Sequence, residues 1–185
     1  MKKQPKTYFE SSSVMILHTG IMLGVIVQLL TSKLMHGHHH NIFAMNCFYL
    51  HRLSGVSIFV MVIFFIGVKI YRGTFWNLYP WHKSGYRAIL VDIKLLLTGR
   101  IPVRQGVGLA RFVQGLGIVV VLAMSALGVT WWLMRTWHLG MPGDARTLIG
   151  WHKSISTLVW IYVIGHTTMA FLHWVWPQDR LVELA

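Results

Sequence analysis

The sequence predicts an all-α integral membrane protein in which four helices cross the bilayer as a bundle. Of its 185 residues, 55% are hydrophobic and only 12% are charged, whereas about a quarter of the residues of a soluble domain are usually charged. Four long apolar stretches each reach the roughly 20 residues that a helix needs to cross the hydrocarbon. A helix is the form expected of such a stretch, because it satisfies its backbone hydrogen bonds internally. We therefore expect a single membrane domain over residues 1–185.

The four spans are expected at about residues 12–32, 44–70, 108–134 and 148–176. The first span follows three lysines and resembles a secretory signal in that respect. It is longer than the apolar core of a typical signal and three more spans follow it, so we expect it to be a retained helix.

The connection at residues 72–108 is long and contains four aromatic residues that suit a membrane interface, namely Trp76, Tyr79, Trp81 and Tyr86. Within it, residues 91–97 are expected to form a short helix on the membrane surface. A docking role for a partner protein is the alternative that the sequence leaves open.

The chain carries 17 Lys+Arg and 5 Asp+Glu, a net charge of +12 with His neutral. A nucleic-acid partner would need a polar folded domain to display these bases; the sequence shows none, so we expect no nucleic acid. The bases are concentrated in the N-terminal tail and in residues 72–108. By the positive-inside rule, both termini and this connection face the cytoplasm of a bacterial inner membrane, where contact with anionic lipid is also expected.

Four histidines lie inside the expected spans, where ionisable side chains are costly and usually mark function. His18 is in the first span, His51 is near the start of the second, and His152 and His166 are both in the fourth. The 14 residues between the last two correspond to about 21 Å along a helix and to within about 40° of whole turns. One face of the fourth span therefore presents two imidazoles, one near each side of the membrane.

The expected depths pair these histidines. The first span starts in the cytoplasm and the second and fourth start outside. His18 and His166 are therefore expected near the cytoplasm, and His51 and His152 near the periplasm. The topology predicts two bis-histidine sites stacked across the membrane, with interhelical hydrogen bonding as the simpler alternative for the same residues.

A porphyrin fits a bis-histidine site because it supplies the four remaining metal ligands in one plane. Zinc would need a tetrahedral set completed by Cys, Asp or Glu, and the spans place none clearly beside these histidines. The single cysteine, Cys47, also excludes a cysteine-rich zinc site or an iron–sulfur cluster held by this chain alone. We therefore expect two haem b groups, held without thioether links because Cys-x-x-Cys-His is absent.

Glycines near the expected ligands would admit a flat macrocycle, although ordinary helix packing is an equal alternative: Gly20, Gly24, Gly55 and Gly165. Cations that could neutralise haem propionates are Arg52, Arg146 and Lys153 on the outer side and Arg111 or Arg180 on the inner side. A membrane-edge cation is the simpler role for each of them.

The other histidines are weaker candidates. His173 could contact a propionate or a quinone, and an interfacial side chain is the simpler alternative. The cluster of His36, His38, His39 and His40 could bind a metal ion, although a solvated loop is the simpler interpretation and its role is left open. His82 and His138 are assigned no role.

At these residues the sequence resembles the bacterial cytochrome b-561 and nickel-hydrogenase cytochrome b superfamily, over nearly the whole chain. The most specific part is His152-Lys153-Ser154 through Ile164-Gly165-His166, followed by Ala170-Phe171-Leu172-His173. His51-Arg52-Leu53-Ser54-Gly55 is similar to the second-helix His-x-x-x-Gly element of this superfamily, and His18 sits where its first-helix ligand belongs. The resemblance implies a four-helix bundle with two b-type haems on these four histidines. The long second connection looks more like those of the cytochrome b subunits of formate dehydrogenases and thiosulfate reductases.

These observations predict an electron carrier between a ubiquinone or menaquinone pool and a periplasmic redox partner. A bis-histidine iron has no free coordination position, so oxygen chemistry at the metal is disfavoured, and we expect no catalytic residue. By resemblance, the partner is either a redox enzyme subunit or superoxide, for which Arg52, Arg146 and Lys153 would provide steering charge. The alternatives from other classes are a non-haem metal-ion channel or transporter and a structural membrane anchor. Whether the protein is an enzyme is left open.

Overall fold

The computed structural model describes residues 12–36, 41–100, 102, 108–140 and 142–175, and this part of the chain contains helices and no strand. The elements are α1 (Ser12–Leu34), α2 (Ile42–Tyr71), the 3-10 helix η1 (Trp76–Leu78), α3 (Lys83–Leu97), α4 (Leu109–Trp137) and α5 (Pro142–Val175). Helices α1, α2, α4 and α5 are long and apolar enough to cross a membrane. The predicted all-α class with four spans is therefore confirmed.

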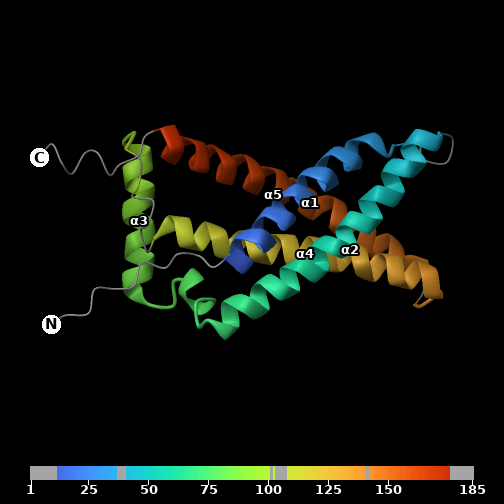
Figure 1. Ribbon diagram of the computed structural model, residues 1–185, viewed down its shortest axis with the longest axis horizontal. Coiled ribbons are helices and arrows are strands. Elements are labelled where there is room, and N and C mark those ends of the chain that lie inside the picture. Colours follow the sequence, from blue (N-terminus) through green and yellow to red (C-terminus); the bar gives the residue numbers. More distant parts are fainter. Residues whose placement is uncertain (1–11, 37–40, 101, 103–107, 141, 176–185) are drawn as a thin grey trace, which may run out of the picture. The chain divides into compact units, whose positions relative to one another are not determined.

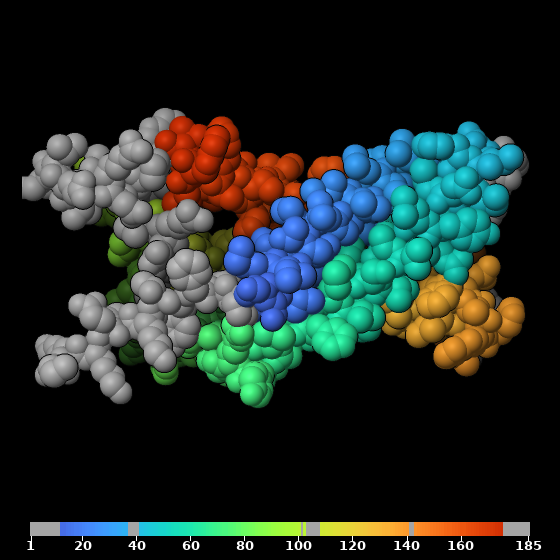
Figure 2. Space-filling model, viewed as in Figure 1, coloured from blue at the N-terminus to red at the C-terminus, as the bar shows by residue number. Residues whose placement is uncertain are grey.

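The chain forms two compact units, Met1–Lys69 and Ile70–Ala185. The first unit is the antiparallel pair of α1 and α2, whose side chains lie against each other in the space-filling view (Figures 1 and 2). Gly20 and Gly24 form a small-xxx-small motif on α1, which allows two helices to approach closely. A Cβ atom at Gly20 would lie 2.9 Å from Met61 Sδ, and one at Gly24 would lie 2.7 Å from Ile58 Cγ1. These two glycines thus serve packing between α1 and α2.

The second unit is built on the packing of α4 against α5, with α3 running across the start of α4 (Figure 1). Asp92 of α3 accepts a 2.8 Å hydrogen bond from the Leu109 N–H, which is one of the unsatisfied donors at the start of α4. A Cβ atom at Gly108 would collide with Asp92 and with the Ala88 carbonyl, 2.8 Å away. Glycine at this position therefore permits the tight turn from α3 into α4.

The 3-10 helix η1 packs on α4 beside a second glycine. A Cβ atom at Gly115 would lie 3.0 Å from Tyr79 Cε1 and 3.2 Å from the Leu78 carbonyl. The Tyr79 hydroxyl donates to the Gly115 carbonyl at 3.4 Å. Burial raises the pKa of Tyr79, so the phenol stays protonated at neutral pH and keeps this donor.

Helices α5 and α3 extend furthest beyond their predicted limits. Helix α5 begins at Pro142 rather than near residue 148, with Asp144 in its first turn. Proline is well suited to the first turn of a helix, and an acidic residue there complements the positive helix end. The surface helix α3 begins at Lys83 rather than at residue 91, because its half-buried side from Gly85 onward follows the helical period.

Candidate functional site

The four intramembrane histidines are distributed over both units. His18 lies on α1 and His51 on α2, in the first unit, whereas His152 and His166 lie on α5, in the second. His18 is exposed and the other three are half-buried. Helix α5 is continuous between its two histidines, so the 14-residue separation keeps both on nearly one face, as the sequence predicted. Each predicted pair takes one histidine from each unit, and the pairing stays a prediction.

A hydroxyl group of α1 sets the orientation of His51. Thr31 Oγ1 lies 3.0 Å from His51 Nδ1, and it also lies 2.7 Å from the Val27 carbonyl oxygen, which can only accept. Because the hydroxyl has one proton and gives it to Val27, it accepts from His51. This arrangement favours the His51 tautomer with its proton on Nδ1, which leaves the lone pair of Nε2 available to a metal.

The polar contacts around His51 continue along the same helix pair. Gln28 Nε2 donates to the His51 carbonyl oxygen and to Ser54 Oγ, the latter at 2.8 Å. A Cβ atom at Gly55 would lie 3.2 Å from Gln28 Nε2. Gly55 thus makes room for the Gln28 side chain, which agrees with the packing interpretation of this glycine. Together, Gln28 and Thr31 fix the start of α2 and its histidine against α1.

A backbone carbonyl of α4 orients His152 in the same manner. His152 Nδ1 lies 3.1 Å from the Met124 carbonyl oxygen, which can only accept, so the proton is again on Nδ1. Helix α4 carries none of the four candidate histidines, yet its Met124 carbonyl is the acceptor for the His152 ring. Gly128 of α4 leaves space for the ring, since a Cβ atom there would lie 3.2 Å from His152 Cε1.

His166 packs against an aromatic ring of its own helix. The Tyr162 and His166 rings are 5.4 Å apart between centroids and inclined by 18°, a stacked arrangement. Tyr162 fills a notch on α4 at Gly117, where a Cβ atom would collide with the phenol. The position of His166 therefore depends on a glycine of the neighbouring helix.

These contacts match what a bis-histidine haem protein requires. Histidines that bind a metal usually donate their other ring N–H to a carbonyl or a similar acceptor, which fixes the tautomer and raises ligand basicity. His51 and His152, the predicted outer pair, both satisfy this condition within their own units. These two residues thus fit a haem, and the Nε2 atoms of His51 and His152 are the ones that would bind iron.

The candidate propionate cations differ in how far they are exposed. The Arg52 guanidinium lies 5.7 Å from the centroid of the Phe48 ring, and it is half-buried, whereas Arg111, Arg146 and Lys153 are exposed. Arg180 lies outside the described residues.

Both ring nitrogens of His173 contact backbone carbonyl oxygens. Its Nδ1 lies 2.7 Å from the Met169 oxygen and its Nε2 lies 3.0 Å from the Pro102 oxygen. These contacts connect the end of α5 to the loop before α4. His36 of the loop cluster contacts the Lys33 carbonyl at 2.9 Å, and the other three histidines of that cluster lie outside the described residues.

Five residues that position the candidate ligands were not predicted from the sequence: Gln28, Thr31, Gly117, Met124 and Tyr162. A backbone carbonyl such as that of Met124 leaves no trace in the amino-acid sequence. The contact between Tyr162 and His166 could have been predicted, because side chains four residues apart on a helix lie next to each other.

Comparison with known families places these residues in context. The sequence model of the family described as prokaryotic cytochrome b561 matches residues 10–183. No curated protein and no solved structure matches the chain.

Proposed function

The chain belongs to the prokaryotic cytochrome b561 family, and from this premise we propose that it binds two haem b groups and carries electrons between the quinone pool and a periplasmic redox partner. Membership makes it a membrane cytochrome b with a role in transmembrane electron transfer. The proposal adds the number of haems, their ligands and the partners. When bound, haem supplies the one-electron redox couple.

The observation that carries the proposal is the matched orientation of His51 and His152. Each ring holds its proton on Nδ1 against an oxygen of a neighbouring helix, which presents Nε2 as a metal ligand. We assign these two histidines to the periplasmic-side haem, and His18 with His166 to the cytoplasmic-side haem. The positions on α5 support this assignment, because 14 residues separate the two levels by about 21 Å.

The protein's own cations complete this assignment. We propose that Arg52, Arg146 and Lys153 neutralise propionates at the outer site and that Arg111 does so at the inner site. Both ring nitrogens of His173 contact backbone carbonyls, so His173 would reach a propionate or a quinone only by giving up one of these contacts. An exposed cation near a carboxylate lowers the energy of the carboxylate only modestly, so these residues adjust haem binding rather than determine it.

Haem content and quinol oxidation test the proposal together. Protein purified from haem-replete cells is expected to be red, to contain about two haem b groups per chain by the pyridine haemochrome assay, and to be reduced by a short-chain ubiquinol or menaquinol in stopped-flow experiments. A colourless protein would instead support the metal-ion channel or the structural anchor. A red protein that no quinol reduces would retain the cofactor and contradict the quinone partner.

A second candidate function is the oxidation of superoxide with quinone as the electron acceptor. The exposed cations Arg146 and Lys153 on α5 favour it, because positive charge near a site attracts a small anion. Reduction of the oxidised protein by superoxide would then be faster than reduction by quinol and would slow with rising salt. If superoxide reduced the protein at the same rate at low and at high salt, Arg146 and Lys153 would no longer support superoxide as the substrate.

Replacing Thr31 with valine is expected to weaken the retention of one haem by about tenfold and to raise its reduction potential, because the acceptor for the His51 Nδ1–H is lost. Thr31→Ser keeps a hydroxyl and should restore both properties. The matched control is Thr147→Val, which removes a similar back-bonding hydroxyl, 3.1 Å from the Gly143 carbonyl, at an exposed site. A redox titration that shows the same two potentials in Thr31→Val and in the wild type would contradict the role of Thr31.

A further inference from the structure

Helix α3 exposes two different stripes on the side that faces away from α4. At about 100° per residue, Lys83, Arg87 and Lys94 lie within about 40° of one another around the helix. Beside them runs an apolar stripe of Tyr86, Leu90, Ile93 and Leu97. Leu90 is 65% exposed and Leu97 is 83% exposed, and the combination of an apolar and a basic stripe is typical of a helix at a membrane interface.

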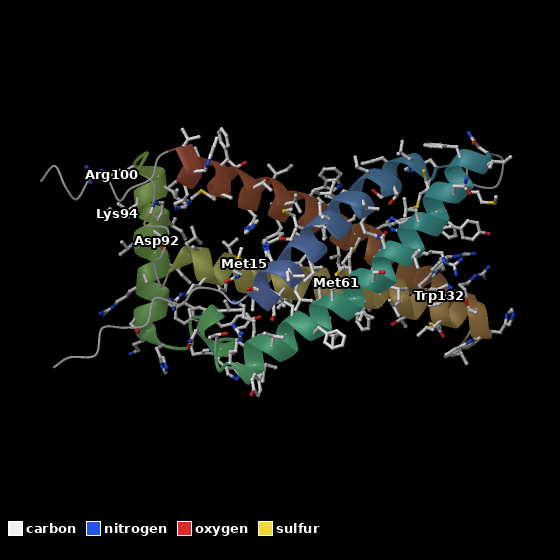
Figure 3. All side chains as sticks on the ribbon, in the orientation of Figure 1. Met15, Met61, Asp92, Lys94, Arg100 and Trp132 are labelled. Atoms are coloured by element: carbon white, nitrogen blue, oxygen red, sulfur yellow. The ribbon has the colours of Figure 1, made fainter. Side chains whose placement is uncertain are left out.

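The C-terminal end of α3 closes with a glycine turn that fixes the next cation. Gly99 has a φ of 73°, its N–H donates to the Leu96 carbonyl at 3.1 Å, and the Arg100 N–H donates to the Leu95 carbonyl at 2.8 Å. This pair of hydrogen bonds is the Schellman motif. It returns the chain toward the helix, and Figure 3 shows Lys94 and Arg100 at this same end of α3.

A cavity of about 330 Å³ lies at this end, lined by Val91, Lys94, Leu95, Thr98 and Arg100. Two cations therefore border a space with an apolar wall. The nearest carboxylate on the helix, Asp92, accepts the hydrogen bond from Leu109 at the start of α4. Among the residues that the structure describes, this leaves Lys94 and Arg100 as a pair of cations that a bound anion would complement.

We propose that this cavity binds the headgroup of an anionic phospholipid, with the phosphate between Lys94 and Arg100 and the glycerol region against Val91 and Leu95. Arginine binds phosphate oxygens in pairs and lysine binds them as a point charge. Because α3 packs across the start of the spanning helix α4, the cavity lies at the end of a membrane span, where lipid headgroups are found. The charge of the ligand follows from the two cations, and its apolar part follows from the cavity wall.

Lipid retention by the purified protein tests this site. The whole chain would be purified in a mild uncharged detergent and titrated with phosphatidylglycerol, phosphatidylcholine or inorganic phosphate, with bound lipid counted by native mass spectrometry. The variant Lys94→Gln/Arg100→Gln removes two charges at the cavity. The matched control, Lys83→Gln/Arg87→Gln, removes two charges from the same helix but not from the cavity lining.

We expect wild-type protein to retain phosphatidylglycerol, the cavity variant to bind it about tenfold less tightly, and the control variant to change by less than about twofold. Equal losses in both variants would mean diffuse attraction to the helix and would overturn the site. Equal retention of phosphatidylcholine, or displacement of the lipid by millimolar inorganic phosphate, would overturn the anionic lipid as its ligand. A fall in the melting temperature of the cavity variant with lipid binding unchanged would show that the cations only stabilise the end of α3.

Discussion

Replacing His166 with alanine is expected to reduce the haem content of the purified protein from about two per chain to about one, and His18→Ala is expected to remove the same haem. Each imidazole is one of the two protein ligands of its iron in the proposed pairing, and a remaining single histidine holds a non-covalent haem weakly. The pyridine haemochrome assay gives the number, and the reduced spectrum shows whether the haem that remains is low-spin.

Double variants test the pairing directly, because the number of haems that each variant retains depends on which histidines share an iron. His18→Ala/His166→Ala removes two ligands of one haem and should still leave about one haem per chain. His18→Ala/His51→Ala removes one ligand from each haem and should leave almost none. His82→Ala is the control, since His82 precedes α3 outside the four spans and should keep both haems. The opposite pattern in the two double variants would refute the pairing by depth.

The four spans could be predicted because membrane insertion depends on length and composition, both of which are local properties of the sequence. The limits of the helices depend on finer local chemistry. The start of α5 at Pro142, with Asp144 two residues later, agrees with known preferences for helix starts and was predictable in principle. The full length of α3 was harder to predict. One side of this helix is half-buried and packs against α4, and the sequence alone does not identify that neighbour.

The candidate ligands were also predictable, since a histidine inside an apolar span is costly and its depth follows from topology. The contacts that orient the rings were not. Whether Thr31 faces His51, or the Met124 carbonyl faces His152, depends on how far each helix is rotated about its axis. A rotation of a few tens of degrees would leave the hydropathy of each span unchanged and would break both hydrogen bonds, so this information exists only in the packed structure.

Replacing Gly117 with alanine is expected to disturb the inner haem while leaving the outer haem in place. The new methyl group would collide with the Tyr162 phenol, and the stacked His166 ring would have to move with Tyr162. Overpacking of this kind costs about 1–3 kcal/mol, which exceeds the gain of about 1 kcal/mol from replacing a helical glycine with alanine. We therefore expect a lower melting temperature and a partial loss of one haem.

The control for this variant is Gly67→Ala on α2, where a Cβ atom would meet nothing within 4 Å. It makes the same chemical change in a spanning helix and should keep both haems with equal or higher stability. The double variant Gly117→Ala/Tyr162→Leu removes the collision and should recover the melting temperature. Because it also removes the aromatic partner of His166, the potential of the inner haem should still differ from that of the wild type. If Gly117→Ala lowers stability yet leaves both haem spectra and both potentials unchanged, then Tyr162 packs against α4 without positioning His166.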